Sequence, residues 1–401
     1  MDDRTPRESH AFTAAVPPAC GRLAILRPVD ERALTERLIT YDTSTLEGMQ
    51  AAAGFVKGWL EARDVEVSGT THNGRPLLTA TVGPDSGPTV VLHGHLDVVP
   101  GREEQFDPRI DGDRLYGRGA YDMKGGLAAM ICALRDVANQ DRVRVHFACV
   151  ADEESEEIDD RASDWLVTNG YLGNFAVTGE PTDLHIGIQA KGVLAMRIEV
   201  VGTAAHGSTP WVGDNAVLKA IDTFRQIESL AFTRESSDLF DRPSINLGRI
   251  VGGDAMNKVP DLCVIDVDVR YLPGQDHQAI RAAVEELPDV RVVKVFHRHP
   301  AIVPRDDPYV QALGEAISRV AEPTSERLGV GRDGASDAIS FLEAGVPAVE
   351  CGPCGDGHHG PEEWVSIRSL GQYRAALVEF VNLLPARLTC DGEDDRRLRI
   401  A

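Results

Sequence analysis

Apolar and polar residues follow two periods along this chain, one typical of amphipathic helices and one of short buried strands. Up to residue 177 they predict helices at 29–41, 46–63, 123–138 and 162–169, and strands at 88–99, 142–150 and 175–177. Helices that alternate with strands act as crossovers, which favours a mostly parallel sheet covered by helices. Such sheets bind ligands at the carboxyl ends of their strands.

The order of elements changes between residues 191 and 300. Strands at 193–201, 244–251, 262–271 and 291–297, with helices at 215–230 and 276–286, give the β-α-β-β-α-β order of a complete ferredoxin-like unit. The first pattern resumes at residue 307 and ends in an amphipathic helix at 369–384. We therefore predict an α/β fold in two parts, 1–188 and 300–401, interrupted by an inserted domain at 189–299.

Charge and cysteine content narrow the class of protein. The 401 residues include 63 Asp and Glu against 41 Lys and Arg, a formal charge of −22. A field of that sign repels phosphate backbones and anionic lipids, so nucleic acid and membranes are not expected as partners. No apolar run approaches the roughly 20 residues of a spanning helix, and residues 1–28 lack the apolar segment of a signal peptide. Seven scattered cysteines argue against a disulfide framework, which indicates a cytoplasmic protein.

Residues that carry chemistry follow the predicted strands. The segment VVLHGHLDVVP ends a strand with His93, His95 and Asp97, which alternation along a strand turns to the same side. Asp97 is able to accept a hydrogen bond from the second ring nitrogen of His95, the usual way in which a metal-bound histidine is oriented. Taken alone, the two histidines fit ordinary hydrogen bonding at a strand end equally well.

The ends of the other strands carry further acids and histidines. Asp122 precedes a helix in a glycine-rich segment and, taken alone, fits an N-cap best. Glu153 and Glu154 follow the strand at 142–150, and because neighbouring side chains diverge, one is able to bind metal while the other takes a proton. Glu180 and the pair His358 and His359 follow two more strands. Two histidines with several carboxylates suit two divalent ions that share one carboxylate.

Cys351 and Cys354 form a C-x-x-C pair. A redox or zinc-ribbon role is disfavoured because the chain has no second cysteine pair and no thioredoxin-like context.

The motifs HGHLDVVP, GRGAYDMKGG, ADEE, GEPT, GTAAHGSTP, GGDAMNKVPD and HGPEEW occur in this order between residues 90 and 365. As a set they resemble the dinuclear zinc hydrolases that include acetylornithine deacetylase, succinyl-diaminopimelate desuccinylase, aminoacylase and carboxypeptidases. The resemblance implies an α/β/α catalytic domain with an inserted dimerisation or lid domain, and two divalent ions per chain, zinc with cobalt or manganese as substitutes.

The resemblance also implies a role for each matching residue of the metal centre. His95 and Glu180 would bind one zinc, Glu154 and His359 the other, and Asp122 would bridge both. Asp97 would orient His95, and Glu153 would be the general base. The doubled His358-His359 departs from the family, which commonly has a glycine-rich turn there; the register favours His359, and His358 stays open as the ligand.

In the inserted domain, the resemblance makes His206 a lid histidine donated to the partner subunit of a homodimer. It also implies that Asn257 and Arg270 bind substrate, Arg270 through a carboxylate, and that Gly334 and Ser336 form a backbone-binding turn.

These roles predict hydrolysis of an amide beside a free carboxylate. Two metals about 3.5–4 Å apart polarise a carbonyl and lower the pKa of a bridging water, and Glu153 would take the water proton. We favour deacylation of an N-acyl amino acid. The alternative is an exopeptidase, either a carboxypeptidase or a dipeptidase. An inactive metal-binding scaffold is an alternative of another class, against which the presence of Glu153 argues.

Overall fold

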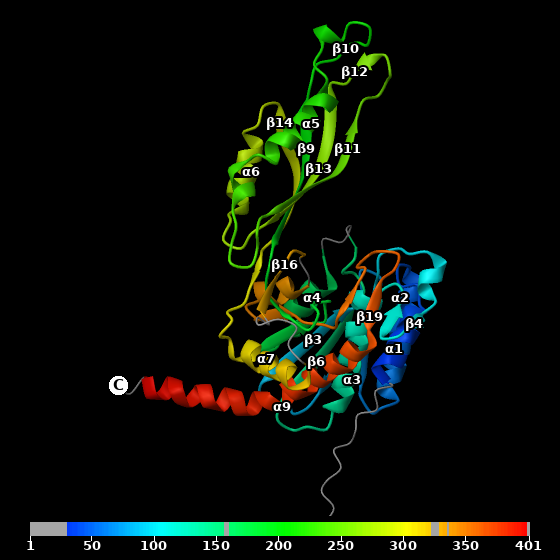
Figure 1. Cartoon of the computed structure of the whole chain (residues 1–401), viewed down its shortest axis with the longest axis vertical. Coiled ribbons are helices and arrows are strands. Elements are labelled where there is room, and N and C mark those ends of the chain that lie inside the picture. Colours follow the sequence, from blue (N-terminus) through cyan, green and yellow to red (C-terminus); the bar gives the residue numbers. More distant parts are fainter. Residues whose placement is uncertain (1–29, 156–159, 322–328, 335–336, 399–401) are drawn as a thin grey trace, which may run out of the picture.

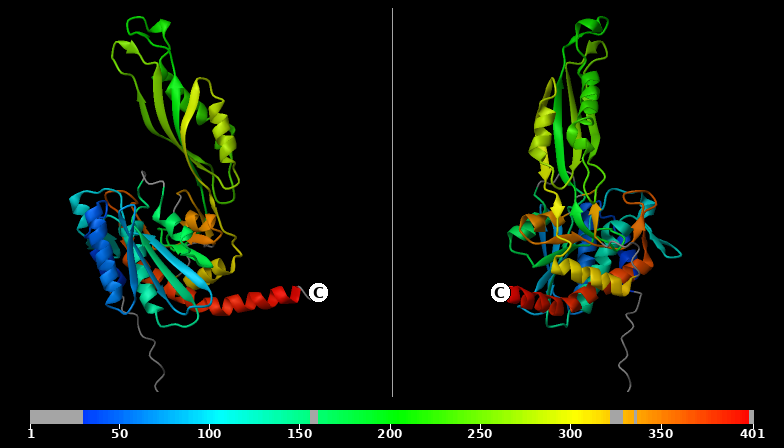
Figure 2. Two further views of the ribbon diagram at one scale, coloured as in Figure 1. Left: turned by 180° about the vertical axis from the view of Figure 1, so that it is seen from behind. Right: turned by 60° about the vertical axis from the view of Figure 1, so that its left-hand side comes forward.

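The computed structural model describes residues 30–155, 160–321, 329–334 and 337–398. These residues form a larger body and an insert that stands apart from it, as Figures 1 and 2 show. The predictions made for residues 1–28 and for Ser336 lie outside the described residues. No helix in the described part of the chain is both long and apolar enough to cross a bilayer.

The larger body is built on a nine-stranded sheet. Its main path runs β1-β2-β6-β3-β7-β17-β8-β15, and β16 pairs with β8. The bounds are β1 Val67–His72, β2 Arg75–Val82, β3 Thr89–His95, β6 Arg144–Val150, β7 Phe175–Thr178, β8 Ile186–Ala190, β15 Ala301–Ile302, β16 Gly329–Arg332 and β17 Ala348–Glu350. The central strands β6, β3, β7 and β17 are parallel, and antiparallel pairs lie toward both edges. The prediction of a mostly parallel α/β sheet is confirmed.

Helices cover both faces of this sheet. They are α1 Asp30–Ile39, α2 Leu46–Glu61, α3 Gly125–Asp136, α4 Ala162–Thr168, α7 Pro308–Val320, α8 Ala338–Glu343 and α9 Ile367–Leu398. In β3, Val90 and Leu92 pack into the core shared with α1, α2, α3, α7 and α9, whereas Val91 packs against α8. Burial on both faces explains why this strand is apolar at consecutive positions rather than alternate ones.

The insert has the predicted element order. Strands β9 Gly192–Val201, β11 Ser244–Gly252, β13 Leu262–Tyr271 and β14 Val290–Arg298 form an antiparallel sheet in the order β11-β13-β9-β14. Helices α5 Ala216–Ile227 and α6 His277–Glu285 share one core with this sheet. The chain leaves the large sheet after Ala190 and returns to it at Ala301. The domain boundaries at 189 and 299 stay predictions.

A small four-stranded sheet, which the apolar pattern did not predict, brings two loops of the larger body together. It consists of β18 Gly355–Asp356, β19 Trp364–Ser366, β5 Arg114–Tyr116 and β4 Arg109–Asp111. Its strands are two or three residues long, too short to carry a periodic signal. The pairing of β19 with β5 sets the segment after Asp111 beside the segment that contains His358 and His359.

The last helix is longer than predicted. It begins at Ile367 and continues through Pro385 to Leu398 instead of ending at residue 384. Proline removes one backbone hydrogen bond, but packing against a neighbouring helix can offset that loss. Here Arg387, beyond the proline, pairs with Glu315 of α7.

Candidate metal centre and active-site cavity

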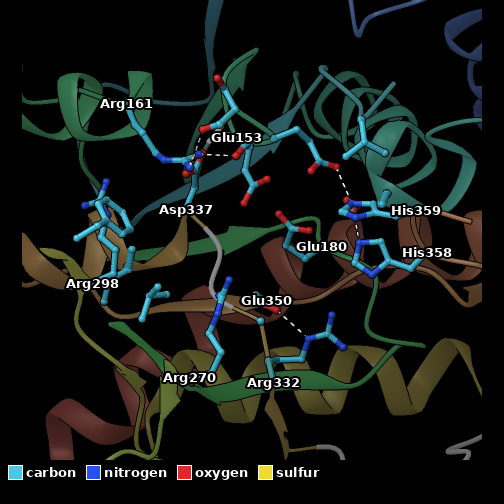
Figure 3. A pocket seen from close by; sticks show the side chains of 18 residues that line it. Glu153, Arg161, Glu180, Arg270, Arg298, Arg332, Asp337, Glu350, His358 and His359 are labelled. Atoms are coloured by element: carbon cyan, nitrogen blue, oxygen red, sulfur yellow. Dashed lines mark hydrogen bonds and ion pairs between the residues drawn. The ribbon is translucent and has the colours of Figure 1, made fainter. Parts of the chain in front are cut away.

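Four neighbouring parallel strands deliver the predicted metal ligands other than Asp122 to one edge of the sheet. His95 is the last residue of β3, Glu153 and Glu154 follow β6, Glu180 follows β7, and the two histidines follow β17. Because these strands are adjacent and parallel, the loops after them meet at the same edge. The sequence order of the motifs therefore becomes a ring of side chains around one cavity (Figure 3).

One group of ligands is centred on His95, which is buried. Its Nε2 lies 3.1 Å from Asp122 Oδ1 and 3.8 Å from Glu180 Oε1. Its Nδ1 lies 3.0 Å from the backbone oxygen of Asp97 and 3.6 Å from the Asp97 carboxylate. The same carboxylate accepts a hydrogen bond from the backbone amide of Glu154 at 2.9 Å. Asp97 therefore contacts both the imidazole of His95 and the loop after β6.

A second group lies on the other side of Asp122. His359 Nε2 is 3.0 Å from Glu154 Oε1 and 3.2 Å from Asp122 Oδ2. His358 also contacts Asp122 Oδ2. The carboxylate of Asp122 thus lies between the two groups, with one oxygen directed at each.

The donor set fits two divalent cations. Among the described residues, His95, Asp122 and Glu180 bring ligand atoms within 4.8 Å of one another, as do Asp122, His358 and His359. Burial, and to a smaller extent the charges of neighbouring carboxylates, raise the pKa of Glu153 and of Glu180. Hydrogen bonds to Asp122 and Glu154 raise the pKa of His359 to about 10. Protonated His359 therefore offsets part of the negative charge of these carboxylates, as a bound cation would. Imidazole with carboxylates suits zinc and similar ions.

Glu363 is a residue of this site that the sequence analysis did not single out. Its buried carboxylate accepts hydrogen bonds from the backbone amides of Gly119, Tyr121 and Asp122 at 3.0–3.1 Å and from Arg118 Nη1 at 2.7 Å. Arg118 Nη2 in turn donates to the backbone oxygen of His359 at 3.1 Å. The Arg118–Glu363 pair therefore ties the Asp122 loop to the histidine loop. The HGPEEW motif contains this glutamate, but no feature of the sequence distinguishes it from Glu362.

The cavity beside the metal ligands has a volume of about 430 Å³, and several arginines line it. Arg270, carried by β13 of the insert, lines this cavity, and so does Gly334. Three further arginines that the sequence analysis did not identify line it as well: Arg161, Arg298 and Arg332. Figure 3 shows Arg270 and Arg332 across the cavity from Glu153, with Glu180 between them.

His206 and Asn257 do not reach this cavity within the chain. His206 lies in β10 Ala205–His206, which pairs with β12 Lys258–Val259 at the end of the insert far from the larger body (Figure 1). The two residues are neighbours, because the amide of Gly207 donates to the backbone oxygen of Asn257 at 2.7 Å. A Cβ at Gly207 would lie 2.9–3.0 Å from the Asn257 backbone, so this approach requires glycine.

The fold and the ligand set together define a metal-dependent hydrolase. The sequence profile of Peptidase family M20/M25/M40 matches residues 91–383, and the chain belongs to this family. Peptidases cleave amide bonds, so the predicted family and enzyme class are confirmed.

Similar proteins agree with this assignment. An acetylornithine deacetylase of Photorhabdus laumondii is 26% identical over 373 residues, 87% of this chain and 94% of that protein. A succinyl-diaminopimelate desuccinylase of Gluconobacter oxydans is 30% identical over 313 residues, 74% of this chain and 81% of that protein. The fold is similar to an M20 family metallo-carboxypeptidase of Sulfolobus solfataricus, with a TM-score of 0.73 at 18% identity over 89% of this chain and 99% of that one.

We expect His359→Ala, but not His358→Ala, to lower the metal content of the purified protein from about two ions per chain toward one. His359 contacts both Glu154 and Asp122, whereas His358 contacts only Asp122 among the site carboxylates of the described chain. Elemental analysis after equilibration with zinc measures the content. Loss of metal in His358→Ala alone would assign the ligand to His358.

We expect Glu363→Gln to weaken zinc binding by about 10–100-fold, the usual effect of removing a hydrogen-bond partner behind a ligand. An amide cannot accept from all four donors, so Asp122 loses its fixed position. Competition with a chelating dye measures the affinity, and Glu362→Gln is the control because Glu362 is exposed and pairs only with Arg109 among the described residues. Equal zinc affinity in both variants would contradict a positioning role for Glu363.

Proposed function

We propose that this protein hydrolyses the amide bond of an N-acyl amino acid that has a free carboxylate. The observation that carries the proposal is the position of Glu153, which lines the same cavity as the metal ligands and Arg270. One end of that cavity suits an amide carbonyl and the other suits a carboxylate.

The metal ligands divide into two sets that share Asp122. His95 and Glu180 would hold one ion with Asp122, and Glu154 and His359 would hold the other with Asp122. Two such ions, for which we propose zinc, would polarise the amide carbonyl and lower the pKa of a water between them. Asp97 would fix the ring of His95 through its contacts at Nδ1.

For Glu153 we propose proton transfer, although its carboxylate lies within 4.8 Å of ligand atoms of His95 and Glu154. No described residue donates a hydrogen bond to its carboxylate, although burial raises its pKa. In this role its carboxylate takes a proton from the attacking water and delivers it to the nitrogen of the leaving amine. The adjacent Glu154 turns toward His359, so the two neighbours have separate tasks.

Arg270 would bind the substrate carboxylate. Its Nε donates to both oxygens of Asp268, at 3.1 and 3.0 Å, which fixes the guanidinium at the cavity wall. The backbone at Gly334 would add contacts to the same substrate, together with Ser336, whose position is outside the described residues. A carboxylate anchor serves an exopeptidase equally well, so cleavage of a dipeptide or C-terminal residue is the second candidate, and a dipeptidase among the fold neighbours favours it. The names of the deacetylase and desuccinylase relatives favour deacylation.

A homodimer would complete the site. The insert exposes large apolar side chains, among them Trp211 at 77% and Leu218 at 61%, and β11 is an edge strand of its sheet. An edge strand with exposed apolar neighbours favours pairing with a second copy. His206 would then reach the partner's cavity with Asn257 beside it. Because the Ser208 amide donates to His206 Nδ1 at 3.1 Å, the neutral ring carries its hydrogen on Nε2, ready to donate to a developing oxyanion.

The cytoplasmic location stays a prediction, supported by the charge and the cysteine pattern.

An inactive scaffold is the alternative to a hydrolase, and it would bind metal without turnover. The activity of a Glu153 variant decides between the scaffold and the hydrolase.

We expect Glu153→Gln to keep about two zinc ions per chain and to lose at least about 10²–10⁴-fold in kcat on N-acyl amino acids, because a base is removed without a ligand. Elemental analysis and a steady-state assay on N-acetyl and N-succinyl amino acids measure the two quantities. Loss of metal before loss of turnover would reassign Glu153 as a ligand, and unchanged activity would remove it from catalysis.

We expect a mixture of His206→Ala and Glu153→Ala chains to recover part of the activity that each variant lacks alone. In a hybrid dimer, the chain with an intact Glu153 receives His206 from its partner. The measurement is turnover after subunit exchange, with exchange followed by differently tagged chains. A mixture as inactive as its components, despite proven exchange, would place His206 outside the partner's site.

A further inference from the structure

Four arginines line the cavity, but they do not present their charges in the same way. Arg298 uses both terminal nitrogens on Asp164, at 3.3 and 2.7 Å. Arg161 uses its terminal nitrogens on three backbone carbonyls of residues 152, 153 and 155. The planar end of each of these guanidinium groups is therefore already occupied.

Arg332 presents its guanidinium as Arg270 does. Its Nε donates to Glu350 at 2.9 Å, and no residue of the described chain accepts a hydrogen bond from its two terminal nitrogens. Its side chain is 29% exposed, close to the 32% of Arg270. A guanidinium held through Nε keeps the pair of donors that matches a carboxylate in a bidentate contact.

The fold is built to seat this arginine. Arg332 ends β16, which pairs with β8, and its aliphatic part crosses Gly187 of that strand. A Cβ at Gly187 would lie 2.9 Å from Arg332 Cγ and 3.1 Å from Glu350 Cβ. Any larger residue at this position would displace both members of the pair, so the glycine creates the space in which they lie.

We propose that Arg332 binds a second carboxylate of the substrate, in addition to the one that Arg270 would bind. The proposal rests on the proposed amide hydrolysis and specifies its substrate class as N-acyl amino acids with two carboxylates. Two cations would balance Asp122, Glu153, Glu154 and Glu180, after which the described residues of the cavity lining include four arginines against Asp337 and Glu350. Two guanidinium ends that have no acceptor among the described residues match a dianion better than a monoanion. The second carboxylate belongs either to the acyl group or to the amino acid side chain.

The test compares three substrates on the zinc-loaded protein: N-acetylmethionine, N-succinylmethionine and N-acetylglutamate. The second has its extra carboxylate on the acyl side and the third on the amino acid side. We expect one of the two dicarboxylates to exceed N-acetylmethionine in kcat/KM. The preference is the ratio of kcat/KM for that dicarboxylate to kcat/KM for N-acetylmethionine. The Arg332→Gln variant should lower this ratio by about 10–100-fold, the range of a charge-assisted hydrogen bond.

The Glu350→Gln variant separates binding from a structural ion pair. It removes the competing negative charge and keeps an acceptor for Nε, so the preference for the dicarboxylate should rise as it falls in Arg332→Gln. A purely structural pair predicts equal damage to both variants. Arg319→Gln is the matched control, because Arg319 is also an ion-paired arginine but lies between α7 and α9. An unchanged ratio in Arg332→Gln overturns the proposal.

Failure of the proposed function is recognised separately. If the zinc-loaded protein hydrolyses none of the three compounds, calorimetry with glutarate, and with butyrate as the monocarboxylate control, still measures the second anion site. Weaker glutarate binding in Arg332→Gln, with butyrate unchanged, supports Arg332 without amide hydrolysis. Equal binding of glutarate by both proteins overturns the role of Arg332 independently of activity.

Discussion

Mutual repulsion among carboxylates is the constraint on which the rest of this structure depends. Asp122, Glu153, Glu154 and Glu180 meet at one edge of the sheet, where two unit charges 4 Å apart interact by about 4 kcal/mol at an effective dielectric constant of 20. Such a cluster persists only if the surrounding fold is rigid and positive charge is close. Buried parallel strands give the rigidity, and imidazole groups with divalent cations give the charge.

The Arg118–Glu363 ion pair lies behind the metal ligands, and there too a carboxylate is balanced by nearby positive charge. A buried carboxylate that accepts three backbone amides and a guanidinium is fully satisfied, so it holds the Asp122 loop without adding an unpaired charge to the cluster. The second half of the chain is needed for this, because it supplies both the histidine loop and Glu363. The metal centre therefore forms only when the two parts of the larger body have come together.

The insert interrupts the larger body without disturbing it, since β8 and β15 pair directly where the chain leaves and returns. Ala190 lies opposite Ala301 in that ladder, so the ends of the insert are adjacent. Arg270 faces the cavity from the insert and the metal ligands face it from the sheet edge. The cavity thus combines acidic residues of the sheet edge, which suit cations, with guanidinium groups from both the insert and the larger body, which suit anions.

The sequence by itself determined the helices and strands longer than about six residues except β2, the ferredoxin-like order of the insert and the motifs that carry His95, Asp122, Glu153 and Glu180. The apolar period and the residue types that follow each strand are local features of the chain, so they can be recognised from the sequence alone. Only the tertiary structure decided that Glu363 and Arg332 belong to the site, because each depends on partners distant in sequence: Glu363 on the loop after Gly117, and Arg332 on Glu350 and the space above Gly187. Strands β18, β19 and β5, which are two or three residues long, set the segment of Glu363 beside the loop after Gly117. Strands of this length form because the surrounding structure stabilises them, and they are too short to show a periodic pattern in the sequence.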